Sequence, residues 1–379
     1  MYHIALKMLM ADRGKYIMLV GGVAFASLLM TQQNGVFRGL LSWTTSHMRN
    51  IRASIWVVEA RVITANETKP LKDTDLNRVR SVPGVDFAEP LFLSVIKARA
   101  ASGGEKPIQL VGLDASTLFG RPPVMLEGDL ERLRLPNAVV IDTLATVRLS
   151  EGLGRPMKVG DTFEINDREA RVVGICKTEK HFFGYPYVFT TYDKAIEYVP
   201  RQRKMLSIIL AEPSPGQTPE DVAARIGLET GLHAYTSAGF SQATTDFVWA
   251  NTGIPASFLT TITLGFIVGV VISAQTFFSF VLENIRHLGA LKAMGASNGL
   301  LARLLLLQAF TVGLIGYGLG VGITAIFGLI VLPFEQPPFL LDYRSLVLTG
   351  LAVVLICLVA ALLGIRKVSR LDPAIVFRG

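Results

Sequence analysis

Four stretches of this chain contain no Asp, Glu, Lys or Arg, and they limit what it can fold into. They are residues 16–37, 247–282, 304–334 and 345–365. A helix needs roughly 20 apolar residues to cross the hydrocarbon core of a bilayer, and each stretch supplies that length. Half of all residues are hydrophobic and 18% are charged, whereas soluble domains average about 25% charged residues. The sequence therefore predicts a membrane protein with four transmembrane α-helices.

The excess positive charge lies beside these apolar stretches. The net charge is +7, and residues 1–15, 283–303 and 366–379 account for all of it, with ten Lys and Arg against three Asp and Glu. Positive charge next to spanning helices marks their cytoplasmic ends. This distribution argues against a basic face for nucleic acid. We expect both termini and the 283–303 segment in the cytoplasm, in a multi-pass membrane protein.

The spans divide the chain into segments. The long stretch between the first and second spans has ordinary globular composition and is sufficient for one folded domain. Residues 2–13 fit either a helix lying on the inner membrane surface or an ordinary charged lead-in. The predicted segments are 1–15, a cytoplasmic N-terminal interfacial helix; 16–37, the first span and a stalk; 38–251, an extracytoplasmic, periplasmic domain; 252–282, the second span with a stalk; 283–303, a cytoplasmic connecting helix; 304–333, the third span; 334–344, an external loop; 345–365, the fourth span; and 366–379, a cytoplasmic tail.

The outer domain alternates strand-like and helix-like patterns, which predicts a mixed α/β fold. Residues 158–176 have the pattern of a hairpin that turns at Asn166-Asp167. Thr218 precedes two acidic residues, as expected of a helix N-cap. The other expected strands are 54–62, 106–114 and 204–213, residues 186–199 are expected to pass from strand to helix, and the expected helices are 73–82, 138–149 and 218–231.

Glycines recur at helical spacing in the second and third spans. Gly265 and Gly269 are one turn apart, as are Gly316 and Gly320. Small residues at this spacing let helix backbones approach closely in lipid. Although the third span resembles a phosphate-binding glycine loop, no Lys-Ser/Thr follows it. We therefore predict that these glycines serve helix packing.

Residues 181–189 form an aromatic cluster in the outer domain. One interpretation is a contact for a partner or a hydrophobic substrate, through Phe182, Phe183 and Tyr185. The other, which we favour, is a loop that leads into a buried strand, with residues 187–189 in the core. Even then, Phe182 and Phe183 could remain exposed.

The chain lacks the common catalytic motifs. It contains no Gly-x-Ser-x-Gly, no His-Glu-x-x-His and no Gly-x-x-x-x-Gly-Lys-Ser/Thr. The five histidines are scattered along the chain, and the spans contain no charged residue that could relay protons or ions. We therefore expect no catalytic, cofactor-binding or metal-binding residues, and any energy for work to come from another protein.

The segment between the second and third spans, "ENIRHLGALKAMGAS", is unusual. Glu283 to Met294 can form a helix, Gly295 can end it, and Ser297 can cap the next helix. An apolar stripe runs through Leu288, Leu291 and Met294. This amphipathic helix is either a connector at the membrane surface or a lever that fits a groove of a cytoplasmic protein.

This segment resembles the signature loop of the MacB/FtsX-type ABC transporter permeases. That loop usually reads Glu-x-x-Arg-Glu-Ile-Gly-x-Leu-Arg-Ala-x-Gly-Ala-Ser. His287 stands where Glu is common, Leu288 replaces Ile, and Lys292 replaces Arg. The C-terminal "RLDPAIVFRG" is similar to the family's closing Asp-Pro-Ala-x-x-x-x-Arg, with Ile375 where Glu is common. The matching positions of the loop are Glu283, Arg286, Gly289, Leu291, Ala293, Gly295, Ala296 and Ser297.

The resemblance implies a permease subunit that has no ATPase site of its own. ATP and Mg would be bound by a cytoplasmic ABC ATPase dimer, and a second permease copy or a paralogue would complete the assembly. Residues 283–303 would form the coupling helix, with the N-terminal segment beside it. The coupling residues would be Glu283, Arg286, His287, Gly289, Leu291, Lys292, Gly295 and Ser297.

Two functions remain open within this resemblance. One is ATP-driven export or extraction of an amphiphile, in some relatives with a periplasmic adaptor and an outer-membrane channel. Chain length and the compact outer domain resemble the DevC-like branch, which would imply a glycolipid. The other is an FtsX-like transducer that moves no substrate and regulates a cell-envelope hydrolase or a signalling partner. A receptor without an ATPase is a third alternative.

Overall fold

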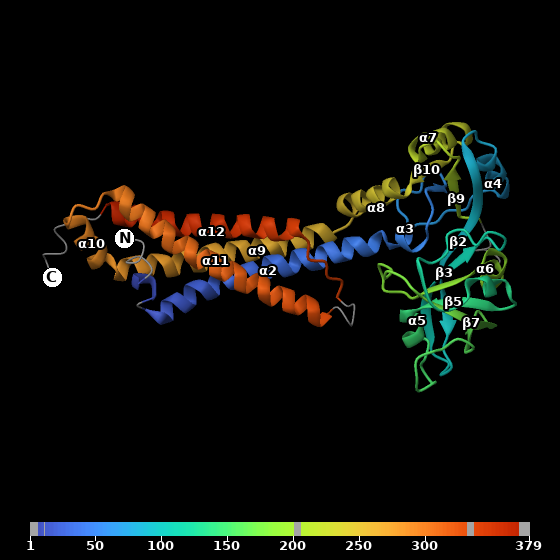
Figure 1. Cartoon of the computed structure of the whole chain (residues 1–379), viewed down its shortest axis with the longest axis horizontal. Helices are drawn as coiled ribbons and strands as arrows, with labels where there is room; N and C mark the ends of the chain where they lie inside the picture. The colour runs from blue at the N-terminus through green and yellow to red at the C-terminus, as the bar shows by residue number, and fades with distance from the viewer. Residues whose placement is uncertain (1–6, 11, 201–205, 332–336, 371–379) are drawn as a thin grey trace. The chain divides into compact units, whose positions relative to one another are not determined.

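The computed structural model describes residues 7–10, 12–200, 206–331 and 337–370. The chain forms two compact units (Figure 1). One comprises Met1–Leu40 and Gly253–Gly379, and the other comprises Leu41–Thr252. The predicted interfacial helix and C-terminal motif fall partly or wholly outside the described residues. Of the former, residues 7–10 are helical; of the latter, residues 371–379 are not described.

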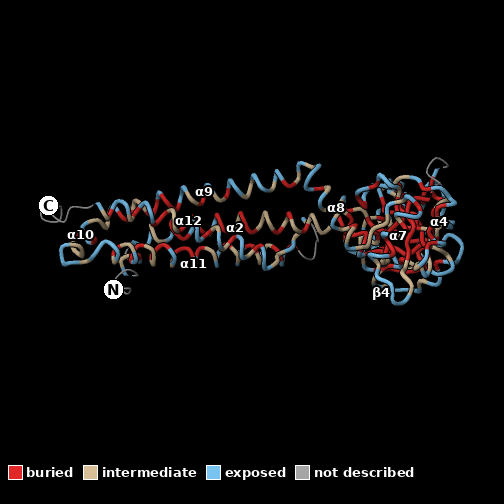
Figure 2. Tube along the Cα trace, turned by 90° about the horizontal axis from the view of Figure 1, so that it is seen from above, coloured by how far each residue is buried: buried red, intermediate tan, exposed pale blue. Residues whose placement is uncertain are grey.

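The first unit is built from four helices that are long and apolar enough to cross a membrane, as predicted. Buried and exposed residues alternate along them (Figure 2), since each helix contacts its neighbours along part of its circumference only. A shorter helix, α10, connects the second and third. The helices are α2 (Arg13–Thr44), α9 (Ile254–Glu283), α10 (Ile285–Ala293), α11 (Asn298–Val331) and α12 (Tyr343–Ser369). The connecting helix is therefore shorter than the expected 283–303, because Glu283 still belongs to α9 and residues 298–303 already belong to α11.

Four glycines of α9 and α11 lie against α2, namely Gly265, Gly269, Gly316 and Gly320. A Cβ atom built on Gly269 would lie 2.5 Å from the Cβ of Ala26, and one on Gly316 would lie 2.7 Å from the Cβ of Val23. At Gly320 it would lie 2.6 Å from the carbonyl oxygen of Ala24. Gly265 faces α2 less closely, with Leu29 at 3.3 Å, whereas Gly318 and Gly322 have nothing within 4 Å. One face of α11 therefore approaches the α2 backbone, and the glycines off that face do not.

Gly320→Ala is expected to destabilise the helix bundle by about 1–3 kcal/mol, because a single added methyl overpacks a close backbone contact. Thermal unfolding of the purified protein in detergent measures this effect. Gly318→Ala is the matched control, since it adds the same methyl to the same helix in open space. Equal stability of the two variants would contradict the packing.

The second unit contains a ten-stranded mixed sheet in the order β10-β1-β9-β2-β3-β8-β5-β7-β4, and β6 pairs with β2 and β7. The β3–β8 and β5–β7 pairs are parallel and the other pairs are antiparallel. The strands are β1 (Ile55–Val58), β2 (Val85–Arg99), β3 (Glu105–Leu113), β4 (Val124–Gly128), β5 (Ala138–Asp142), β6 (Thr162–Ile165), β7 (Arg168–Lys177), β8 (Tyr187–Thr191), β9 (Ile208–Pro213) and β10 (His233–Thr236).

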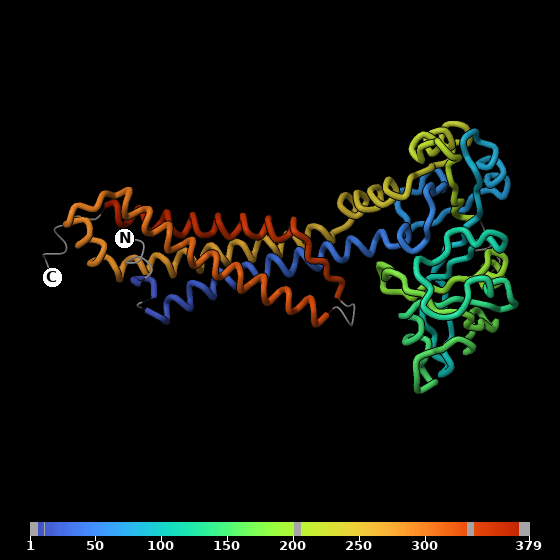
Figure 3. The backbone as a smooth tube through the Cα atoms, in the orientation of Figure 1, coloured from blue at the N-terminus to red at the C-terminus, as the bar shows by residue number. Residues whose placement is uncertain are grey.

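Strand β2 joins two lobes of this unit (Figure 3). Residues 85–91 pair with β9, and residues 92–99 pair with β3. Separate hydrophobic cores lie at each end, and a third contains residues from both. The helices are α3 (Ser46–Asn50), α4 (Asp73–Arg80), the 3-10 helix η1 (Leu130–Arg134), α5 (Thr143–Arg148), α6 (Tyr192–Tyr198), α7 (Pro219–Thr230) and α8 (Ser237–Asn251).

Local turn chemistry is confirmed and one helix prediction is wrong. Asn166 and Asp167 have φ of 50° and 61° between β6 and β7, as a two-residue hairpin turn requires. The Thr218 side chain accepts a hydrogen bond from the Asp221 N–H and caps α7. Residues 138–149, expected as one helix, instead form β5 followed by α5. Their first residues are a short β-branched run that is buried between β7 and β8, and periodicity cannot distinguish such a run from a helix.

Candidate coupling site

The connector between α9 and α11 has well-defined ends. Gly295 adopts φ of +94°, and its N–H donates to the Lys292 carbonyl at 3.0 Å, while the Ala296 N–H donates to the Leu291 carbonyl at 3.0 Å. This is a Schellman C-cap, which glycine favours because it can adopt positive φ. The Leu300 N–H lies 3.3 Å from the Ser297 hydroxyl. The predictions that Gly295 ends one helix and Ser297 caps the next are confirmed.

The apolar stripe of α10 faces the helix bundle. Leu288 is 1% exposed and belongs to the bundle core, Gly289 is buried, and Leu291 packs against the same core. Met294, at 75% exposed, is the one member of the stripe that faces outward. Leu288 and Leu291 therefore have partners within the chain, and contact of α10 with a groove of a cytoplasmic protein remains a prediction.

Three polar residues of the connector face outward. Arg286 and His287 are exposed on α10, as is Glu283 at the end of α9, and Arg286 forms no ion pair within the described part of the chain. Lys292 is half-buried, and its Nζ donates to the Ser369 carbonyl at the end of α12, at 3.2 Å. The outward face of α10 thus combines polar groups with Met294, while its inward face is fixed to the bundle.

The N-terminal segment lies beside the connector. Lys15 forms an ion pair with Glu283 and another with Asp12, at 3.1 Å. Leu9, which is 1% exposed, belongs to the same buried cluster as Leu288. Exposed ion pairs contribute about 1 kcal/mol or less, so the apolar contacts hold this arrangement more strongly than the charges do. The structure confirms the expected neighbourhood.

The comparisons with known proteins decide the family. Residues 259–373 match the FtsX-like permease C-terminal domain, and residues 17–227 match the MacB-like periplasmic core domain. The chain belongs to the MacB/FtsX-type ABC transporter permeases. Two uncharacterized ABC transporter permeases of Mycobacterium tuberculosis are 23% and 26% identical to it, and each alignment covers 82% of this chain and 80% of the relative.

The second unit, Leu41–Thr252, contains most of the residues that match the periplasmic core domain and is called the outer unit below. Two solved structures are similar to part of this permease. The periplasmic region of MacB from Actinobacillus actinomycetemcomitans is 14% identical and matches with a TM-score of 0.36, over 54% of this chain and 97% of that one. The extracellular domain of the noncanonic ABC-type transporter YknZ from Gram-positive bacteria is 12% identical and matches with a TM-score of 0.35, over 48% and 99% of the two chains.

The aromatic cluster of the permease is divided between core and surface. Tyr187, Val188 and Phe189 are fully buried in β8, so the favoured interpretation is confirmed for them. Phe183 is 62% exposed, whereas Phe182 and Tyr185 are half-buried. Contact of these last three with a partner or substrate remains a prediction.

Sequence reasoning missed a pair of buried histidines, His181 of this cluster and His47 of α3. The rings of His47 and His181 have centroids 5.1 Å apart, beside a cavity of about 250 Å³. His47 Nδ1 lies 3.0 Å from the Tyr187 hydroxyl, and His181 Nδ1 accepts the Phe183 N–H at 3.1 Å. Burial lowers the pKa of His47 to about 3, with His181 contributing, and burial lowers the pKa of His181 to about 4. The two residues are far apart in sequence, so no local pattern could have paired them.

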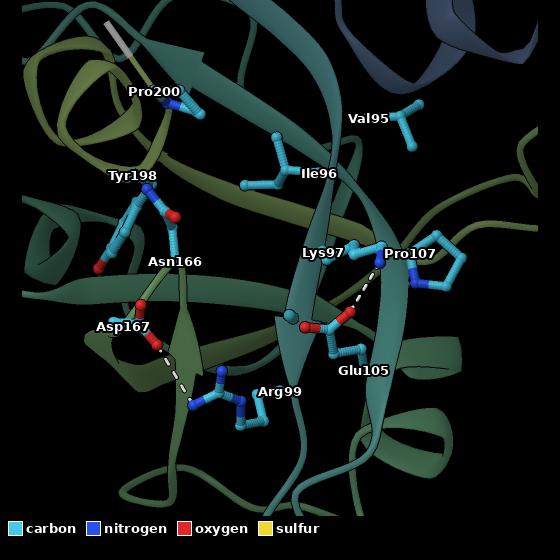
Figure 4. A pocket seen from close by; sticks show the side chains of 11 residues that line it. Val95, Ile96, Lys97, Arg99, Glu105, Pro107, Asn166, Asp167, Tyr198 and Pro200 are labelled. Atoms are coloured by element: carbon cyan, nitrogen blue, oxygen red, sulfur yellow. Dashed lines mark hydrogen bonds and ion pairs between the residues drawn. The ribbon is translucent and has the colours of Figure 1, made fainter.

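A second cavity, of about 710 Å³, lies against β2 and β3 (Figure 4). Lys97 pairs with Glu105 at 2.7 Å, and Arg99 pairs with Asp167 at 3.2 Å. Both cations of this cavity, Lys97 and Arg99, are therefore paired with carboxylates that line the same cavity. Within the described ranges, no three His, Cys, Asp or Glu side chains gather in a way that could hold a metal ion.

Proposed function

We propose that this permease couples ATP binding and hydrolysis on a cytoplasmic ABC ATPase dimer to movement of its outer unit, and that the movement exports or extracts an amphiphile. The chain would lie in the bacterial inner membrane with both termini and α10 in the cytoplasm. Its excess of positive charge beside the spans supports this orientation. A second permease copy or a paralogue would complete the assembly.

This proposal rests on the arrangement of α10, which is attached to the helix bundle on one side and exposed on the other. Leu288 is buried in the bundle core, and Lys292 is bonded to the end of α12. Arg286, His287 and Met294 are left on the opposite side. A helix fixed in this way transmits displacement to α9 and α11, because packed interiors deform little. An ATPase that contacts the outward side would therefore move both helices.

Co-purification with an ABC ATPase from the same genome tests the proposal. We expect a stable complex whose ATPase rate depends on the permease, and release of an amphiphile from cells that stops when the permease is deleted. If no ATPase binds, the proposal is wrong and a receptor without an ATPase is favoured. If binding occurs but deletion alters cell-wall cleavage and leaves export intact, the permease is a transducer.

The Lys15–Glu283 pair provides a finer test. Glu283→Lys is expected to reduce the coupled ATPase rate about two- to fivefold, because an exposed pair contributes about 1 kcal/mol or less and here becomes a repulsion between two cations. Lys15→Glu in the same chain should restore most of the rate by re-forming the pair with opposite polarity. If the double variant is as slow as the single one, Glu283 acts through the ATPase rather than through Lys15.

A further inference from the structure

A third cavity, of about 700 Å³, lies in the outer unit between the end of α3 and the loop that follows β3. Two arginines and two phenylalanines line it: Arg52, Arg121, Phe87 and Phe119. The two phenylalanine rings meet edge to face, with centroids 4.9 Å apart. Its volume falls within the range of about 300–1,000 Å³ that is typical of small-molecule sites.

The loop of residues 114–121 carries Phe119 and Arg121 and is held firmly. The Asp114 carboxylate accepts the N–H groups of Ser116 and Thr117 at 2.9 and 2.8 Å. Arg134 donates to two carbonyls of the same loop, each at 2.8 Å. The cavity wall is therefore formed before any ligand arrives, which lowers the entropic cost of binding.

The loop also adopts backbone conformations that few residues tolerate. Leu118 has φ of 51° and Gly120 has φ of +84°. A Cβ atom on Gly120 would lie 2.9 Å from both Ile51 Cγ2 and Leu210 Cδ1. On the opposite wall, Phe87 lies where the β2–β9 register shifts, and such bulges redirect side chains beside functional sites. The positions of both phenylalanine side chains therefore depend on uncommon backbone geometry: positive φ angles on either side of Phe119 and a register shift at Phe87.

The arginines of this cavity lack carboxylate partners. Arg52 and Arg121 are exposed and form no ion pair within the described ranges. The two lining carboxylates have other partners. Glu89 pairs with Arg80 at 2.7 Å, and Glu212 accepts the N–H and the hydroxyl of one residue, Ser54, at 2.9 and 2.6 Å. The cavity of Figure 4 differs, since its cations are paired.

We propose that this cavity binds an anionic amphiphile, with a carboxylate or phosphate head held by Arg52 and Arg121 and an apolar chain packed on Phe87 and Phe119. Guanidinium groups hold such heads through charge-assisted, bidentate hydrogen bonds. An anionic head without a chain would contact only the two arginines, and a cationic amphiphile would contact only the two phenylalanines. The proposal rests on the function proposed above, because it names the chemical class of the substrate.

Equilibrium dialysis tests this site, with the full-length permease in phosphatidylcholine nanodiscs and empty nanodiscs as background. The probes are dodecanoate, dodecyl phosphate, dodecyltrimethylammonium and inorganic phosphate. We expect saturable binding of the two anionic amphiphiles. Arg52→Gln and Arg121→Gln should each weaken it about tenfold or more. Arg171→Gln, which removes an exposed charge from β7, should leave it unchanged.

Three results would overturn the proposal. They are equal saturable binding of dodecyltrimethylammonium, binding of inorganic phosphate as tight as that of dodecyl phosphate, and an Arg52→Gln/Arg121→Gln double variant that binds like the original chain. Hydrogen exchange of residues 41–252 confirms that each variant is folded. The dialysis requires no ATPase, so its failure is separate from a failure of the coupling experiment.

Discussion

Arg286→Glu is expected to lower the coupled ATPase rate by about tenfold or more while the permease remains folded. Arg286 is exposed on α10 and forms no ion pair within the described chain, so its reversal leaves no internal carboxylate without a partner. At a protein interface, loss of one member of a buried charge pair costs about 2–5 kcal/mol, and 1.4 kcal/mol corresponds to a factor of ten. The rate is measured with the permease and its ATPase reconstituted together.

The control is Arg344→Glu, which reverses an exposed charge at the first turn of α12. In the proposed topology it lies on the side opposite to α10, so it should leave the ATPase rate unchanged. Thermal unfolding should be the same for both variants. An Arg286→Glu permease that retains the full rate would mean that the ATPase contacts another surface.

The membrane fold could be predicted because few physical rules govern it. A charge-free stretch of sufficient length has little alternative to a spanning helix, and all four helices are present. The C-terminal end of α10 and the start of α11 were also predictable, because Gly295 and Ser297 act through their own backbone and side chain. Helix-capping interactions of this kind can be predicted from a sequence where no tertiary contact competes with them.

What each helix face contacts was harder to predict. Leu288 and Leu291 recur at helical spacing, which shows that α10 has an apolar face but not what covers it. The structure shows that the bundle does. Gly289 is buried for the same reason, so a substitution there would disturb packing, whereas Arg286 is exposed and provides the clearest test of coupling. The residues of the proposed amphiphile site could not be predicted from the sequence, because Arg52, Phe87 and the 114–121 loop come together only in the folded domain.

Acidification from pH 7.5 to pH 5 is expected to reduce the free energy of unfolding of the outer unit by roughly 4 kcal/mol through His47 and His181. Burial lowers their pKa values to about 3 and about 4, whereas a histidine in the unfolded chain has a pKa near 6.5. Above pH 6.5 both residues are neutral in both states, and the stability is complete. Below it, the unfolded chain binds protons that the folded unit excludes, so stability falls until the pH reaches the folded values.

Urea unfolding of the full-length permease, followed by hydrogen exchange of residues 41–252, measures this dependence. The His47→Gln/His181→Gln double variant should show a much flatter pH profile between 7.5 and 5, although its stability at neutral pH will be lower because the contact with Tyr187 changes.

His233→Gln is the matched control. His233 is exposed, so this variant should retain the full profile of the original chain. A double variant with the original slope would assign the acid sensitivity to carboxylates instead of the histidine pair. The expected slope follows from the position of the pair: both rings are buried, and His181 is stacked on Tyr185 of the same loop, so the folded unit binds these protons only at a lower pH than the unfolded chain does.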